Sequence, residues 1–157
     1  MEPPRAILSP CGLYRYLLWR AASSRGSGTC LFVMLNPSTA DADRDDPTLR
    51  RCISFASSWG FARVELANLF AFRATDPEEL LQAADPVGPD NDRYVLEAAR
   101  RAHRIVVAWG AHGTHLGRGD TVRKMLAEFQ VLSFGLTATG QPRHPLYLRA
   151  DTVPLPL

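Results

Sequence analysis

The chain has 157 residues, of which 46% are hydrophobic and 22% charged, and its net charge of +2 permits an anionic partner without requiring one. These values suit a single domain over residues 1–157, and a membrane-spanning protein is excluded because no apolar run approaches the ~20 residues that cross a bilayer. The N-terminus lacks a secretory signal and the three cysteines contain no CxxC pair, so we expect a cytoplasmic protein without a zinc site. We also expect a monomer without a cofactor.

Two apolar runs precede the first predicted helix. Residues 13–20 are aromatic and partly alternating, which is typical of a strand, and residues 30–35 form a fully apolar run typical of a strand buried on both faces. Because a turn rich in Ser and Gly separates them, these two strands could pair as a hairpin. A helix is then predicted, with Asp46 as its N-cap, Pro47 at its first position and Gly60 at its end.

Predicted strands and helices alternate through the rest of the chain. This alternation implies βαβ units, so we expect an α/β protein, with a three-layer α/β/α sandwich around a mostly parallel central sheet. In such folds ligands bind beyond the carboxyl ends of the strands. The predicted elements are strands at residues 63–72, 104–109 and 130–136, a short helix at residues 76–84, a longer helix that begins near Asp90, and a helix at residues 119–129.

Unusual polar residues occur at the ends of four predicted strands. Asn36, followed by Pro37 and Ser38, ends the first buried strand, and Asn68 lies near the end of the next. The third strand ends in "WGAH" and the fourth is followed by "RHP", which contains His144. Because four such loops would meet at one edge of a parallel sheet, we expect them to form a pocket.

Each of the three central candidates has a structural and a functional interpretation. Asn36 could orient a water through its carbonyl oxygen, with Pro37 holding the backbone, or it could form an Asx turn. His144 could donate a hydrogen bond to developing negative charge or shuttle a proton, or it could lie on the surface of a turn stiffened by proline. Asn68 could bond a neighbouring loop, or its donor and acceptor could read the edge of a nucleobase.

An acidic loop with Asp41, Asp43, Asp45 and Asp46 follows the first buried strand. Asp46 is most simply the helix cap, and the other three are expected to be solvated. One of them could instead activate water as a general base or bind Mg²⁺ beside a phosphate. The glycines match neither a dinucleotide-binding nor a phosphate-cradling motif, and no serine lies in a G-x-S-x-G elbow.

Long motifs in this chain resemble a bacterial family catalogued as domain of unknown function 1643. The motifs are "MLNPSTAD", "DDPTLRRC", "NLFAFRATDP", "DPVGPDND", "WGAHG" and "RHPLYL". The resemblance covers almost the whole chain, from about Gly12 to the C-terminal tail, and it implies membership of a family without a known activity.

The order of the motifs also resembles the uracil-DNA glycosylase superfamily, in its mismatch-specific branch. "MLNPS" resembles the loop that positions the attacking water, "ELANLFAFRA" the strand that reads the base, and "RHPLY" the loop whose histidine stabilises the departing base. The resemblance implies a fold like that of these glycosylases, with Asn36 and His144 as catalytic residues. The implied substrate-binding residues are Pro37, Ser38, Asp41, Asn68, Arg73, Arg143, Leu146 and Tyr147.

The expected function is hydrolysis of an N-glycosidic bond, which releases a nucleobase from DNA or from a nucleotide. Such an enzyme places water at C1′ and hydrogen-bond donors on the departing base, and a wedge such as Leu146 or Tyr147 fills the gap left by a flipped base. One alternative is a binding module for a nucleobase, a nucleotide or modified DNA, because the amide of Asn36 is a poor general base. Another is an Mg²⁺-dependent hydrolase of nucleotide phosphates that uses the acidic loop.

Overall fold

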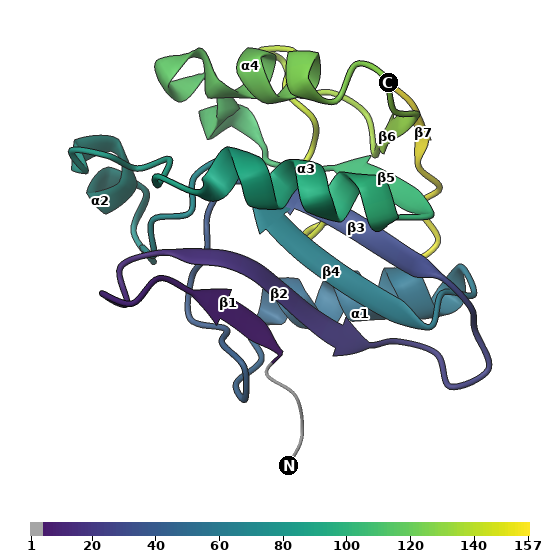
Figure 1. The fold of residues 1–157 in the computed structure, drawn as a ribbon. Coiled ribbons are helices and arrows are strands. Elements are labelled where there is room, and N and C mark those ends of the chain that lie inside the picture. Colours follow the sequence, from purple (N-terminus) through teal and green to yellow (C-terminus); the bar gives the residue numbers. More distant parts are fainter. Residues whose placement is uncertain (1–4) are drawn as a thin grey trace.

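The computed structural model describes residues 5–157, which form a mixed α/β structure with a seven-stranded sheet and four α-helices (Figure 1). The strands lie in the order β1-β2-β4-β3-β5-β6-β7 across the sheet. Their bounds are β1 (Ala6–Leu8), β2 (Arg15–Ala21), β3 (Thr29–Met34), β4 (Arg63–Asn68), β5 (Arg104–Val107), β6 (Val131–Ser133) and β7 (Leu155–Pro156).

The four central strands of the sheet are parallel, and the flanking strands are antiparallel. Parallel pairings join β4 to β3, β3 to β5 and β5 to β6, whereas β1, β2 and β7 run in the opposite direction to their neighbours. The predicted α/β class is therefore confirmed, with a parallel centre. Met34 pairs with Asn68 at the ends of β3 and β4, so the polar residues that follow these strands begin at the same edge.

The predicted hairpin between the first two apolar runs is wrong. β2 pairs with β4, and β4 lies between β2 and β3. A fully apolar strand is suited to the middle of a sheet, where it needs a neighbour on each side. β4 and β5 fill both sides of β3, which places β2 at the far edge of β4.

Local signals located the helices well. The helices are α1 (Pro47–Ser58), α2 (Pro77–Gln82), α3 (Asn91–Arg101) and α4 (Arg118–Met125), and a 3-10 segment η1 (Ala111–Gly117) precedes α4. The Leu49 N–H donates to Oδ1 of Asp46 at 2.8 Å, which confirms Asp46 as the N-cap of α1. Gly60, just beyond the helix, adopts φ of 87°, a conformation that favours glycine.

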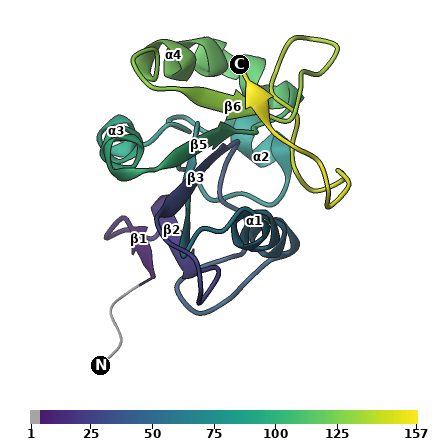
Figure 2. The same cartoon turned by 90° about the vertical axis from the view of Figure 1, so that its right-hand side faces the viewer.

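The helices cover both faces of the sheet, with α1 on one side and α3 and α4 on the other (Figure 2). On the α1 side, Phe32, Met34 and Leu66 pack against Leu49 and Phe55 of the helix. None of the helices described between residues 5 and 157 has the length and hydropathy that a membrane crossing needs. The acidic loop joins β3 to α1, and Asp46 and Thr48 at the start of the helix lie beside the carboxyl ends of β3 and β4.

An irregularity in the pairing of β1 and β2 changes the direction of one side chain. Ile7 pairs with Leu17 but Leu8 pairs with Arg15, so Tyr16 is an extra residue in β2. Residues three apart on a regular strand face opposite sides of the sheet, and one extra residue places them on the same side. Arg15 therefore faces the α1 side together with Leu18.

Candidate functional site

A cavity of about 160 Å³ lies at the carboxyl ends of β3 and β4, on the side of the sheet that α1 covers. The loops after β3 and β6 and the end of β4 contribute Asn36, His144 and Asn68 to its lining, and Ser38 lies at its edge. The structure thus brings together four of the residues that the sequence singled out. The further polar lining residues are Arg15, Asp46, Thr48 and Thr75.

Asn36 is held by its amide nitrogen. Nδ2 donates to the carbonyl oxygen of Ala74 at 2.8 Å and to that of Pro37 at 3.0 Å. Because both partners are acceptors, the nitrogen must face them and Oδ1 must face the other way. Asn36 therefore ties the loop after β3 to the segment after β4, and its oxygen remains the atom that can orient a water or accept from a ligand.

The imidazole of His144 is held as a neutral hydrogen-bond donor. Its Nδ1 accepts the N–H of Leu146 at 3.1 Å, so the proton of the neutral ring is on Nε2. Burial lowers the pKa of His144, and the negative charge of Asp46 opposes this effect only in part. The ring can therefore donate from Nε2 near neutral pH without first being protonated.

Asn68 is a buried amide that the surrounding protein does not satisfy. Asn68 is only 1% exposed, and within residues 5–157 neither its Nδ2 nor its Oδ1 has a hydrogen-bond partner. Each such group costs about 1–3 kcal/mol when it is left unbonded. The backbone, by contrast, is fixed: Asn91 Nδ2 donates to the carbonyl oxygen of Asn68 at 2.9 Å. A rigidly placed amide with an unmet donor and acceptor is suited to binding a ligand in this cavity.

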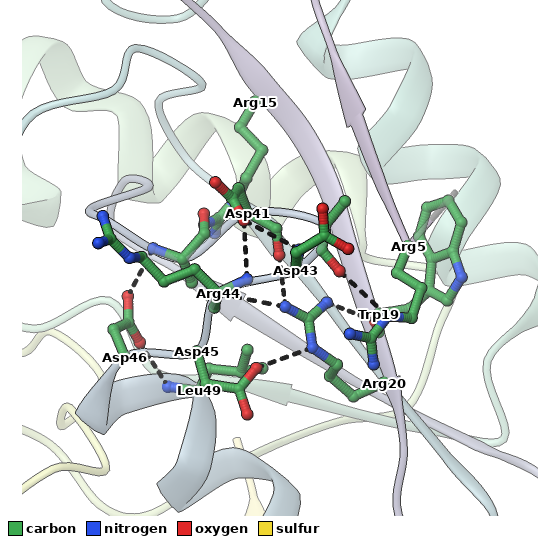
Figure 3. Close-up of polar contacts among 12 residues, drawn as sticks. Arg5, Arg15, Trp19, Arg20, Asp41, Asp43, Arg44, Asp45, Asp46 and Leu49 are labelled. Carbon is green, nitrogen blue, oxygen red and sulfur yellow. Dashed lines mark hydrogen bonds and ion pairs between the residues drawn. The ribbon is translucent and has the colours of Figure 1, made fainter. Parts of the chain in front are cut away.

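Arg15 and Arg20 of β2, together with Arg5 just before β1, hold the acidic loop (Figure 3). Their guanidinium groups donate mainly to backbone carbonyl oxygens of the loop, and Arg20 also bonds those of Asp41 and Arg44. The sequence did not predict these contacts, because they join residues 21 to 37 positions apart. One bond from each arginine is Arg5 Nε to Ala42 O at 3.0 Å, Arg15 Nη1 to Ala40 O at 2.7 Å, and Arg20 Nε to Asp45 Oδ1 at 2.9 Å.

Three of the four aspartates of the loop make hydrogen bonds or ion pairs within the chain, although Asp45 is also exposed, as expected. Oδ1 of Asp41 accepts the N–H groups of Asp43 and Arg44, and these bonds lower the pKa of Asp41. Asp45 pairs with Arg20. Asp46 is buried, caps α1 and lines the cavity. In the part of the chain that the structure describes, no group of three or more His, Cys, Asp or Glu side chains is arranged for a metal ion.

The remaining predicted substrate-binding residues lie around the cavity rather than in it. Asp41 and Arg73 line an open cleft of about 340 Å³ that shares Ser38 with the cavity. Pro37 is buried, and its carbonyl oxygen accepts the N–H of Ala74 at 3.0 Å. The last three belong to the segment around His144: Arg143 donates to the carbonyl oxygen of Leu136 at 3.4 Å, Leu146 bonds His144, and Tyr147 is 92% exposed.

Two buried charged residues of the cavity were not predicted to bind a ligand. Asp46 was recognised only as a helix cap. Arg15 was missed because regular alternation places it on the same side as Leu17, and only the extra residue Tyr16 turns it toward the α1 side. The only sequence signal that could have indicated charged residues in the cavity lining is the presence of arginines beside the run of aspartates.

Comparison with known proteins adds a family but no activity. No curated protein and no solved structure matches this chain. A family model described as "Protein of unknown function (DUF1643)" matches residues 15–146, a range that contains every residue of the cavity lining. The chain therefore belongs to the DUF1643 family.

Proposed function

We propose that this protein resembles the uracil-DNA glycosylases in fold and chemistry, and that it hydrolyses an N-glycosidic bond to release a nucleobase from DNA or from a nucleotide. The observation that carries the proposal is the shared cavity, in which Asn36, His144 and the unsatisfied amide of Asn68 are held at one edge of the sheet. The helices on both faces of the sheet support the corresponding three-layer arrangement (Figure 2).

The chemistry assigns a role to each of the three side chains. Cleavage of the bond builds positive charge on the sugar and negative charge on the base. Oδ1 of Asn36 would orient the attacking water at C1′, and Nε2–H of His144 would donate to a base oxygen as that oxygen becomes anionic. A neutral imidazole fits this role, since its proton is already in place on Nε2. The amide of Asn68 would read the edge of the base.

The size of the cavity favours a single ring. A volume of about 160 Å³ is close to that of an engineered protein cavity of about 150 Å³ that binds benzene. A pyrimidine base is therefore the expected occupant. A purine would require Ser38 or Thr75, both exposed at the cavity edge, to move.

A non-catalytic binding module is the second candidate, and one observation favours it. An amide cannot take the proton of the attacking water, so Asn36 would need help from a carboxylate. The carboxylate that lines the cavity is Asp46, whose oxygens accept the N–H groups of Leu49 and Ala40. A chain with this arrangement could bind a base and leave the glycosidic bond intact. The Mg²⁺-dependent alternative has less support, because Asp41 and Asp46 are occupied by backbone amides and Asp45 by Arg20.

Oligonucleotides that contain uracil, a mismatch or another deaminated base test the proposal. Cleavage followed by alkali would produce strand breaks, and Asn36→Ala and His144→Ala should each slow the release of the base by at least ~10²-fold. His112→Ala is a matched control, because this histidine is exposed on η1 and does not line the cavity.

The outcomes separate the candidates. Binding of a free base without cleavage of any substrate would support the binding module. Activity that strictly requires Mg²⁺ and is lost in Asp41→Asn would support the metal-dependent reading. Neither binding nor cleavage across the panel of bases would contradict the proposal itself.

A further inference from the structure

Arg15 is directed into the cavity by a local irregularity of the sheet. It lines the cavity together with Leu18, although residues three apart on a regular strand face opposite sides. The extra residue Tyr16 in β2 resolves this conflict. Bulges of this kind are over-represented beside active sites, where they re-aim a side chain.

The guanidinium group of Arg15 is buried without a partner of opposite charge. The residue is 3% exposed, and its Nη1 bonds only the neutral carbonyl oxygen of Ala40. Within residues 5–157, Nε has no hydrogen-bond partner and no carboxylate lies within ion-pair distance. Burial lowers the pKa of Arg15 to about 10, so the group stays positively charged at neutral pH.

The other two buried arginines of the described chain are treated differently. Arg20, in the same strand, is 4% exposed and pairs with Asp45. Arg118 is 6% exposed, pairs with Asp92 and donates to the carbonyl oxygen of Leu69 at 2.8 Å. The fold thus provides a carboxylate for each of these structural arginines. Arg15, which lines the cavity, lacks one, and a buried cation of this kind is costly unless a ligand pairs with it.

We propose that Arg15 is a ligand-binding residue of the cavity, and that it recognises an oxo oxygen of a base whose ring carries or gains negative charge. This inference rests on the proposed function and identifies the class of base. Arg15 offers a donor, and Asn68 offers a donor and an acceptor. The complementary edge presents two oxo acceptors and an N–H between them, which is the imide edge of uracil or thymine. Cytosine presents an amino donor in place of one acceptor.

Because Arg15 is charged, the cavity should prefer the anionic form of a base. Binding measurements without catalysis can test this preference. When a pyrimidine leaves the sugar it becomes an anion at N1, and this anion still carries N3–H for Asn68 to accept. The groups charged around Arg15 are Asp46, Arg20, Arg73 and Asp41, with Asp46 the strongest neighbour of opposite sign. Between the lowered pKa of His144, which also lines the cavity, and the pKa of about 10 of Arg15, the imidazole stays neutral and the guanidinium stays charged. A change in affinity over that range therefore reports ionisation of the ligand.

Calorimetric titration with free bases tests this preference. 5-Fluorouracil ionises more readily than uracil, so its affinity for the wild-type chain should rise at least ~10-fold as the pH passes its pKa, the scale of one charged hydrogen bond. N1-methyl-5-fluorouracil cannot form the N1 anion, and its affinity should fall over the same range because it loses N3–H.

Variants locate the effect at Arg15. Arg15→Met should weaken uracil binding at least ~10-fold and abolish the rise with pH. Arg15→Lys should keep the rise, because it keeps the charge. Arg20→Lys is the matched control, since Arg20 is equally buried in the same strand but does not line the cavity; its affinities should equal those of the wild type.

Three results would overturn the inference. The first is a wild-type affinity for 5-fluorouracil that is flat or falls with pH, and this measurement holds even where Arg15→Met does not fold. The second is an Arg15→Met variant that binds uracil as the wild type does. Both leave the proposed function intact, provided that bases bind. The third is a wild-type chain that binds no base at all, which overturns the inference together with the proposed function.

Discussion

The side-chain amide of Asn36 donates to the carbonyl oxygen of Ala74 at 2.8 Å, and this bond joins the end of β3 to the segment that follows β4. The same amide donates to the carbonyl oxygen of Pro37. Two parallel strands therefore end in loops that are tied together by the residue proposed to orient water. The nitrogen of this side chain has a structural role and its oxygen a proposed chemical role. Even a substitution that preserves the shape of the side chain should therefore have a measurable effect.

Asn36→Asp should destabilise the chain by about 1–3 kcal/mol at neutral pH. The substitution keeps the shape of the side chain but places a carboxylate oxygen against the carbonyl oxygens of Pro37 and Ala74. Because those neighbours disfavour the charged form, the folded state raises the pKa of the introduced carboxyl group. The penalty is therefore present above that raised pKa and shrinks as the pH falls through it. Urea denaturation between pH 4 and 7 measures this.

Asn36→Ala is the control for this prediction, because it removes the donor without adding an acceptor. The difference between its free energy of unfolding and that of the wild type should change little with pH over the same range. A loss of stability in Asn36→Asp that is the same at pH 4 and pH 7 would show that the carboxylate does not face the two carbonyl oxygens.

The free energy of unfolding should fall as the pH drops from 7 to 5, in part because of His144. Burial lowers the pKa of this histidine in the folded state, so the unfolded chain takes up the proton first. Its contribution to stability is complete above the unfolded pKa of ~6.5 and is lost as the pH falls below it. His144→Gln should flatten this part of the profile. His112→Ala, which changes an exposed histidine, should leave the profile as in the wild type; identical profiles for wild type and His144→Gln would contradict the assigned burial.

Asp46 links the stability of α1 to the electrostatics of the cavity. Asp46→Ala removes the N-cap bond to Leu49 and the bond from Ala40, so it should cost about 0.5–2 kcal/mol. Asp46→Asn keeps a good cap but removes the negative charge that raises the pKa of His144. That pKa should therefore fall further, which an NMR titration of the imidazole measures. An unchanged His144 titration in Asp46→Asn would show that the two groups do not interact.

Local chemistry made part of this structure predictable. The order Asp46-Pro47 places a cap and a preset φ in adjacent residues, so it defines the start of α1 whatever surrounds it. The apolar run that ends at Asn36 defines β3 in the same way, because a strand without polar side chains requires burial on both faces. The position of Asn68 near the end of an apolar strand indicated a polar group at the edge of the sheet.

Pairings between distant segments were not predictable in this way. β2 lies beside β4 because β4 and β5 occupy the two sides of β3. The residues of segment 13–20 alone do not indicate which strands take those positions. The direction of Arg15 depends on one extra residue in the pairing of β1 with β2. Whether a buried amide finds partners also depends on all of its neighbours, so the unsatisfied state of Asn68 follows from the assembled fold alone.

Tyr147 provides the clearest test of whether the natural substrate is duplex DNA. It lies three residues after His144 and is 92% exposed, so its ring is available to fill the gap that a flipped base leaves in a duplex. Tyr147→Ala should change the free energy of unfolding by less than about 0.5 kcal/mol, as expected of an exposed side chain. It should reduce release of the base from duplex DNA while leaving the binding of free uracil unchanged. Leu13→Ala, which truncates another exposed apolar residue outside the cavity lining, is the control. Equal losses on duplex and single-stranded substrates would argue that Tyr147 does not act as a wedge.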